Sequence, residues 1–81
     1  MSAVYLTRVD DARNMARYYR MSLQPTLFGE WAVVREWGRI GRGGQVRTRP
    51  FPSEAEAMLS VATIERQKAR RGYVVAKTDC S

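Results

Sequence analysis

The sequence predicts an α+β domain in which an antiparallel four-stranded sheet carries one long helix on one face. Three observations predict this fold. Four segments within the first 51 residues are rich in β-forming or alternating apolar side chains, a capped helical segment begins at Ser53, and Gly and Pro residues separate the segments. A chain of 81 residues can build one modest core, so we expect a single domain with its core over residues 4–76 and a frayed tail over 77–81.

The expected strands cover residues 4–9, 16–24, 30–37 and 45–51. In the second of these, side chains alternate, and Tyr19, Met21 and Leu23 fall on one face. The third carries apolar groups on both faces, which is typical of a central strand. Because residues 38–44 contain four glycines, we interpret them as a hairpin loop between the third and fourth strands.

The helix has the clearest local signal in the sequence. Ser53 and Glu56 form a capping box, and no Gly or Pro interrupts the segment from Glu54 to about Arg71. The following Gly72 is a natural residue for ending a helix. The predicted core-facing stripe consists of Ala55, Met58, Leu59, Ala62 and Ala69, widened by Val61 and Ile64. Residues 73–76 are interpreted either as a short returning strand or as an extended tail.

The composition points to an anionic partner and away from catalysis. The net charge is +6 with a pI near 10.3, and Arg supplies 12 of the 14 basic residues. The guanidinium group fits phosphate in a bidentate manner, so nucleic acid is the first partner to consider. There is no His, and the single Cys80 cannot form an internal disulfide or a zinc site. With no activating base and no recognisable acidic pair, we expect a protein that is not an enzyme and needs no metal or cofactor.

Targeting signals are also missing from the sequence. The first residues lack the basic start, apolar run and cleavage site of a signal peptide, and no stretch approaches the roughly 20 apolar residues of a membrane span. We therefore expect no membrane association and a location in a bacterial cytoplasm, at the nucleoid if the chain binds DNA. The sequence makes no prediction about the oligomeric state.

The segment over residues 35–49 is the candidate binding site. Its arginines accompany a single acid, a glycine-rich hairpin and a tryptophan, which together are typical of a loop that contacts phosphate and packs a sugar or base. The glycines could equally serve the turn itself. The candidate DNA-binding residues are Arg35, Trp37, Gly38, Arg39, Arg42, Arg47 and Arg49.

The hairpin also resembles a known family. The segment Glu36–Gly41, which contains Trp37, Gly38 and Arg39, is similar to the Trp-Gly-Arg signature of the WGR domain. The resemblance extends to other segments in order, over about residues 16–74: Tyr18–Leu23, Trp31–Arg35, Phe51, the capped helix start Ser53–Ala57, and Arg71–Tyr73. An ordered set of this length is far more specific than the tripeptide alone.

The resemblance implies a DNA-binding role. WGR domains occur in DNA-dependent poly(ADP-ribose) polymerases, where they contact DNA at a strand break and relay that binding to the catalytic region, and also as modules in bacteria. It implies that Trp37 packs against a sugar or an end nucleotide, and that Gly38 permits close approach of the backbone. Arg39 would hold a phosphate or contact a neighbouring protein domain. The roles of Arg42, Arg47 and Arg49 rest on charge alone.

The sequence departs from the polymerases in one respect, because no regulatory or transferase domain follows the module. We therefore expect no ADP-ribosylation by this chain alone, and expect binding to DNA ends or breaks, with a partner protein possible in trans. Two alternatives remain open. One is a protein-interaction adaptor that docks through Trp37 and Arg39. The other is RNA binding through the sheet face that carries Tyr18, Arg20 and Ser22.

Overall fold

The computed structural model describes the backbone of residues 2–80 and the side chains of residues 3–76. Its elements are strand β1 (Ser2–Asp10), a short 3₁₀ helix η1 (Asp11–Arg13), strands β2 (Met15–Pro25), β3 (Trp31–Arg39) and β4 (Gln45–Phe51), helix α1 (Glu54–Arg70) and strand β5 (Val74–Cys80). All strand pairs are antiparallel, which confirms the predicted α+β class.

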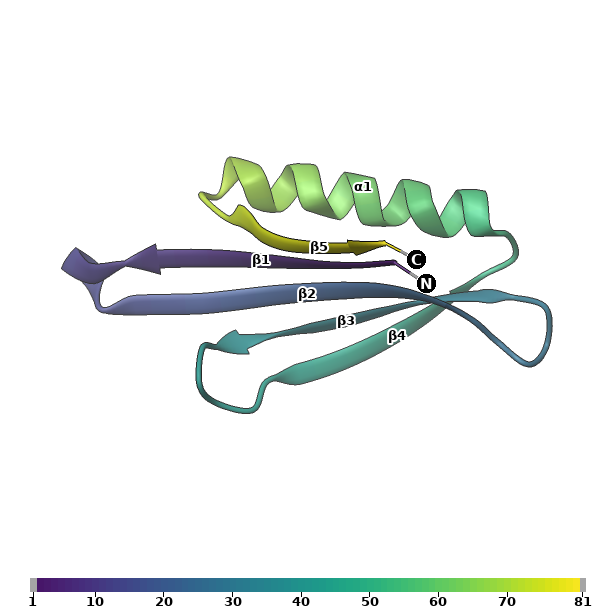
Figure 1. Cartoon of the computed structure of the whole chain (residues 1–81), viewed down its shortest axis with the longest axis horizontal. Coiled ribbons are helices and arrows are strands. Elements are labelled where there is room, and N and C mark those ends of the chain that lie inside the picture. The colour runs from purple at the N-terminus through teal and green to yellow at the C-terminus, as the bar shows by residue number, and fades with distance from the viewer. Residues whose placement is uncertain (1, 81) are drawn as a thin grey trace.

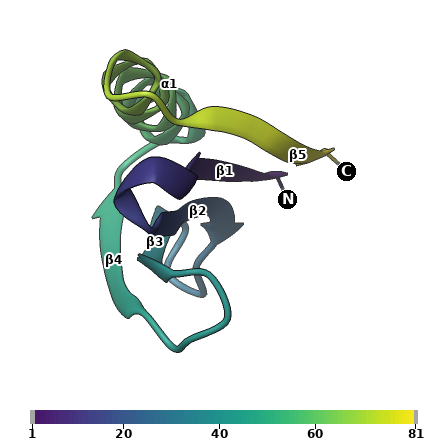
Figure 2. The ribbon, with the colours of Figure 1, turned by 90° about the vertical axis from the view of Figure 1, so that its left-hand side faces the viewer.

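The five strands form one sheet in the order β4-β3-β2-β1-β5, with α1 lying along one side of it (Figure 1). The end-on view in Figure 2 shows the sheet twisting beneath the helix, whose other side faces solvent. The predicted fourth strand, 45–51, matches β4, and Ser53 caps α1 by accepting a hydrogen bond from the Glu56 backbone N–H at 3.2 Å. The molecule is elongated, with extents of 45 × 24 × 20 Å.

The strand number differs from the prediction. The sheet has five strands rather than four, because the segment after Gly72 returns along β1 as β5. Gly72 makes this reversal possible with a φ of 96°, in the left-handed region that a side chain disfavours. The backbone of residues 77–80, which we expected to fray, belongs to this strand. Ser81 lies outside the described residues.

The start of the glycine-rich hairpin also differs. Gly38 and Arg39 were assigned to the loop, but they are the last two residues of β3 and pair with Tyr18 and Arg17 of β2. Arg39 is therefore held by the register of the sheet and not by a loop. The positive φ of 87° at Gly41 marks the turn that follows.

The core lies between the sheet and one narrow strip of α1. The predicted buried face of β2 is confirmed, because Tyr19, Met21 and Leu23 are all buried. The predicted helix stripe is wrong. The fully buried helix residue is Ala57, whereas Met58 and Leu59 are 54% and 68% exposed.

The contacting strip of the helix passes through Ala57, Val61, Ile64 and Lys68. These positions recur every three or four residues, as a single helix face requires. The other predicted stripe members, Ala55, Ala62 and Ala69, point to solvent. Only the members that had been added to widen the stripe, Val61 and Ile64, face the core.

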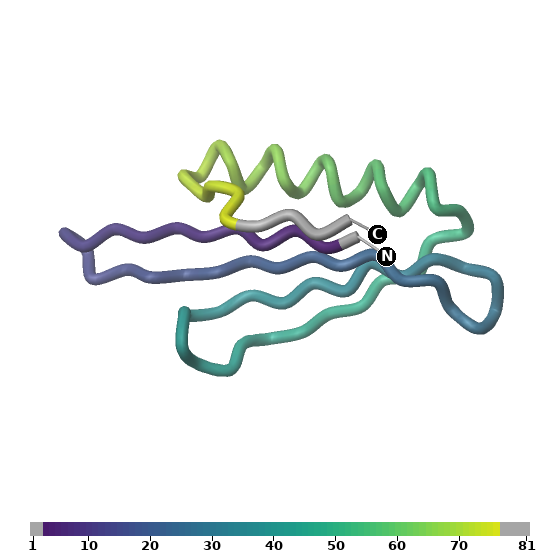
Figure 3. The backbone as a smooth tube through the Cα atoms, viewed as in Figure 1, coloured from purple at the N-terminus to yellow at the C-terminus, as the bar shows by residue number. Residues whose placement is uncertain are grey.

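Three segments that are distant in the sequence meet at one end of the molecule. Figure 3 shows the β1–β2 turn, the β3–β4 hairpin and the C-terminal end of α1 at the same end of the sheet. The β2–β3 turn and the start of the helix lie at the opposite end. None of the described helical residues forms a segment long and apolar enough to cross a membrane.

Candidate nucleic-acid interface

Three arginines face one another across three strands at this end of the sheet. The register pairs Arg8 of β1 with Arg17 of β2, and pairs Arg17 with Arg39 of β3. Paired residues of an antiparallel sheet project from the same face with Cβ atoms about 5 Å apart, so like charges at such positions repel. We call these residues the arginine row. Within the fold the row is unfavourable, and an anion placed over it would remove the repulsion.

The next row on the same face consists of Leu6, Tyr19 and Trp37, which are cross-strand partners. The rings of Tyr19 and Trp37 stack with centroids 5.9 Å apart and planes 17° apart, and we call these two residues the aromatic row. Tyr19 is buried and Trp37 is partly buried, so the stack has one side in the core and one side toward the surface. Such a surface can pack against a sugar or a base.

The end of the helix closes over this aromatic row. The Tyr73 N–H donates to the Lys68 carbonyl at 3.0 Å and the Gly72 N–H donates to the Ala69 carbonyl at 3.1 Å, which is a Schellman motif with Gly72 in the left-handed position. This turn brings Tyr73 back beneath the last helical turn. The Lys68 Nζ lies 4.5 Å from the Tyr19 ring centroid and 5.5 Å from that of Tyr73.

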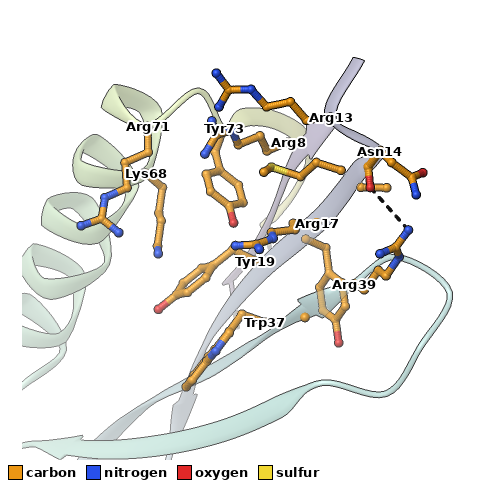
Figure 4. A pocket seen from close by; sticks show the side chains of 14 residues that line it. Arg8, Arg13, Asn14, Arg17, Tyr19, Trp37, Arg39, Lys68, Arg71 and Tyr73 are labelled. Carbon is orange, nitrogen blue, oxygen red and sulfur yellow. Dashed lines mark hydrogen bonds between the residues drawn. The ribbon is translucent and has the colours of Figure 1, made fainter. Parts of the chain in front are cut away.

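A hollow of about 510 Å³ lies between these elements (Figure 4). Six cationic side chains line it: Arg8, Arg13, Arg17, Arg39, Lys68 and Arg71. Tyr19, Trp37 and Tyr73 line it as well, and Tyr18 borders it from the opposite face of the sheet. We call this hollow the basic groove. A second hollow of about 280 Å³, the side hollow, adjoins it and is lined by Tyr19, Arg35, Trp37, Arg47 and Lys68.

The positive charge of the basic groove is almost unopposed. No acidic residue is among the described residues that line it. The one ion pair found among the described side chains joins the exposed Arg13 to the partly exposed Asp10 at 3.7 Å. The Arg39 guanidinium donates to the Asn14 carbonyl at 3.5 Å, which orients its side chain without neutralising it. Among the residues whose side chains the structure describes, no cluster of three or more His, Cys, Asp or Glu residues is placed to hold a metal ion.

The positive charge around the groove affects the ionisation of Lys68. Burial disfavours its charged form, and the neighbouring guanidinium groups of Arg71 and Arg35 repel it, so the pKa of Lys68 lies below its ordinary value. The ring faces of Tyr19 and Tyr73 attract the ammonium group and oppose this effect in part. A phosphate bound in the groove would favour the charged form and raise the pKa again.

The structure brings most of the predicted site residues together. Trp37, Gly38 and Arg39 line the basic groove. Arg35 and Arg47, which are cross-strand partners, line the side hollow with Trp37. The remaining two lie elsewhere.

Arg49 lies two residues beyond Arg47 on the same face of β4, with its guanidinium 5.1 Å from the Phe51 ring centroid. Arg42 lies in the exposed hairpin turn and lines neither hollow. The predicted segment therefore divides into a clustered part and a peripheral part.

The glycines of the hairpin have structural tasks of their own. A Cβ atom on Gly38 would lie 2.9 Å from the Gly44 Cα, and a Cβ on Gly44 would overlap the Trp37 carbonyl. The two glycines therefore let the strands of the hairpin approach closely beside Trp37. By contrast, a Cβ on Gly43 would meet nothing within 4 Å.

Several groove residues were not predicted from the sequence: Arg8, Arg13, Arg17, Lys68, Arg71, Tyr19 and Tyr73. For two of them, the sequence contains a pattern that indicates their position. Arg17 lies two positions before Tyr19 and Arg8 lies two positions after Leu6, so strand alternation places both on the face of the core. The contribution of Lys68 and Arg71 depends on how the helix lies over the sheet, which the local sequence does not determine.

The opposite sheet face offers less than expected for stacking with RNA. Tyr18 is only 8% exposed, and its hydroxyl donates to the Glu36 carboxylate at 2.9 Å. This hydrogen bond, together with burial, raises the pKa of Tyr18 above its ordinary value. Its ring stacks on Tyr5 at 5.9 Å between centroids. Tyr18 is thus engaged within the fold and has little free ring surface.

Comparison with known proteins agrees with the resemblance in the sequence. The sequence model of the WGR domain matches residues 2–79, nearly the whole chain. An uncharacterized protein, y4dW, of Sinorhizobium fredii (strain NBRC 101917 / NGR234) is 47% identical over 70 residues. The aligned region covers 86% of this chain and 34% of the relative, so the chain spans about a third of the relative's length. No solved structure matches the chain significantly.

Proposed function

This chain belongs to the WGR domain family, a family of nucleic-acid-binding modules, and from that premise we propose that it binds DNA at ends, nicks or breaks without reading base sequence. The binding surface in this proposal is the basic groove with the adjoining side hollow. Binding requires no cofactor and no catalysis by the chain itself. The site of action would be the bacterial nucleoid, with a partner protein in trans where a signal must be relayed.

The arginine row is the observation that carries the proposal. Arg8, Arg17 and Arg39 are fixed opposite one another by the register of three strands, at a cost to the stability of the sheet. No hydrogen-bonded acid among the described side chains compensates for that cost. Residues that destabilise a fold in this manner are typical of binding sites. Guanidinium groups bind phosphate in bidentate geometry, so a phosphate is a suitable ligand for this row.

The aromatic row supports the preference for an end. Inside an intact duplex the faces of the bases are covered by their neighbours, whereas an end or a nick exposes one base face and its sugar. The Tyr19–Trp37 stack lies directly beside the arginine row, so one nucleotide can place its phosphate over the guanidinium groups and its sugar or base against Trp37. Backbone contacts and stacking of this kind carry no sequence information.

Titration of a fluorescent blunt duplex at several salt concentrations tests DNA binding. With roughly five phosphate contacts from the groove, the logarithm of the association constant should fall with the logarithm of salt concentration with a slope near −4.5. The affinity would then decrease about 500-fold between 50 and 200 mM salt. A folded protein that does not bind the duplex at 50 mM salt would refute the proposal.

A second candidate function is a protein-interaction adaptor, and one observation favours it. Leu27 and Phe28 are 100% and 88% exposed in the β2–β3 turn, at the end of the molecule opposite the basic groove. The turn is ordered by Thr26, whose side chain accepts hydrogen bonds from the backbone N–H groups of Phe28 and Glu30. Failure to bind DNA at low salt would favour this function, because the turn carries apolar side chains suited to a protein partner.

A further inference from the structure

The basic groove contains one cation that can lose its proton. Lys68 is the single lysine among the described side chains, and the other five cations that line the groove are arginines. A guanidinium group stays charged at every pH that a protein tolerates, whereas a lysine amine can act as a neutral nucleophile. Lys68 also lines both the basic groove and the side hollow, so it lies where the two meet.

The position of the amine is defined by packing on both sides. The Nζ lies 4.5 Å from the Tyr19 ring centroid and 5.5 Å from that of Tyr73, and Figure 4 shows the side chain reaching from the helix toward the aromatic row. Burial disfavours the charged amine, and the cationic groups of Arg71 and Arg35 repel it, so the pKa of Lys68 in the free protein lies below its ordinary value. No carboxylate is among the described residues that line either hollow.

We propose that Lys68 forms an imine with the open-chain aldehyde of a deoxyribose that has lost its base, so that the groove captures abasic DNA covalently and reversibly. This inference rests on the proposed function, because the groove must first hold the DNA. The ligand class is a 2-deoxyribose phosphate with a free C1′ aldehyde. The capture is stoichiometric and involves no turnover.

The chemistry balances without any further reactant. The lone pair of the neutral Nζ attacks the C1′ aldehyde carbon, a C–N bond forms, and the carbonyl π electrons move to the oxygen. A proton passes from nitrogen to that oxygen, giving a carbinolamine. Loss of the hydroxyl group with a second proton from nitrogen releases water and leaves a C=N bond. One amine and one aldehyde thus give one imine and one water, and nothing is oxidised or reduced.

The surroundings suit this ligand. Cationic groups of the arginine row can hold the phosphates that flank the abasic position. Arg71 lines the basic groove with Lys68, and Arg35 lines the side hollow with it, so these guanidinium groups can stabilise the negative charge that develops on the aldehyde oxygen. The faces of Tyr19 and Tyr73 that border the amine can pack against a sugar that no base covers.

Reductive trapping tests the proposal. The full chain is mixed with an excess of a duplex that carries one abasic site beside a nick, and sodium cyanoborohydride reduces any imine to a stable amine. DNA is kept at a concentration that saturates each protein, as measured by fluorescence anisotropy. The adduct is separated on a denaturing gel, and the modified peptide is identified by mass spectrometry. A duplex with a tetrahydrofuran residue, which has no aldehyde, is the control probe.

We expect an adduct on Lys68 with the abasic probe and none with the tetrahydrofuran probe. Lys68→Arg should reduce the yield at least tenfold, while Lys77→Arg, the matched change at the other lysine of the chain, should leave it unaltered. An undiminished yield in Lys68→Arg, or an adduct on the N-terminal amine instead, would overturn the inference. So would saturated binding without an adduct. Absence of binding to every probe would remove the proposed function and this inference together.

Discussion

Arg17 lies between Arg8 and Arg39 in the arginine row, so its replacement should affect stability and binding in opposite directions. Arg17→Gln keeps a polar side chain of similar length and removes two opposed like-charge pairs. Such pairs cost about 0.2–1 kcal/mol each, and Arg17 is exposed and therefore screened by solvent and salt. We expect the free energy of unfolding to rise by about 0.5–1 kcal/mol at low salt. In a domain of this size this corresponds to an increase in Tm of about 2–8 °C.

The same change should weaken DNA binding. A charge-assisted hydrogen bond to phosphate contributes about 1.5 kcal/mol at the lower end of its range, which corresponds to a roughly tenfold loss of affinity. The salt slope should become shallower by about 0.9, the contribution of one phosphate contact. Thermal melts at 50 mM and 1 M salt, together with anisotropy titrations, measure both effects. The gain in Tm should shrink at 1 M salt, where the Debye length is only about 3 Å.

Arg20→Gln is the matched control for this experiment. Arg20 is an exposed arginine of the same strand, but it projects from the opposite face, where its cross-strand partners are Tyr5 and Glu36. Its removal relieves no repulsion, so we expect no increase in Tm and little change in affinity. If Arg17→Gln lowered the Tm, or if both variants bound DNA alike, the assignment of the arginine row as a phosphate site would be refuted.

Three further predictions test the surrounding structure. Gly44→Ala should destabilise the fold by about 1–3 kcal/mol, because the added methyl overlaps the backbone of β3, whereas Gly43→Ala should be nearly neutral in the same denaturant titration. Ala57→Leu should cost about 1–3 kcal/mol by overpacking the core, and Ala62→Leu should change stability by less than about 0.5 kcal/mol; equal effects would contradict the orientation of α1. Burial and nearby guanidinium groups lower the pKa of Lys68, whereas a bound phosphate raises it. DNA affinity should therefore fall as the pH rises through a window below 10.5, the ordinary pKa of lysine. Titrations between pH 7.5 and 9.5 should show a smaller fall for Lys68→Arg, and parallel curves would argue against a phosphate at this position.

Much of the fold followed from local signals in the sequence. Alternation placed Tyr19, Met21 and Leu23 on the buried face of β2, and the capping residue Ser53 located the start of α1. The buried face of the helix could not be predicted from such signals, because Met58 and Leu59 are apolar yet exposed. The helix contacts the sheet along one narrow strip. Because alanines occur on all faces of the helix, the apolar periodicity does not distinguish this strip from the exposed faces.

Only part of the candidate site could be predicted from the sequence, for a related reason. Trp37 and Arg39 are adjacent in the chain to the glycine-rich hairpin and were identified from it. Arg8 and Arg17 join them through the register of β1 with β2 and of β2 with β3, which is a non-local property. Lys68 joins them through the placement of the helix end. Pairing between distant segments cannot be derived from composition or spacing within either segment.

The comparison of an open with a closed duplex tests the central claim most directly. A nicked or blunt duplex with a 5′-phosphate is titrated against the same sequence closed into a dumbbell, at several salt concentrations and with a melt to show that the protein is folded. The account predicts tighter binding to the open duplex and a steep loss of affinity with salt, because an end exposes a phosphate for the arginine row and a nucleotide face for Trp37. Equal affinity for both forms would contradict end recognition and reduce the groove to a general polyanion site.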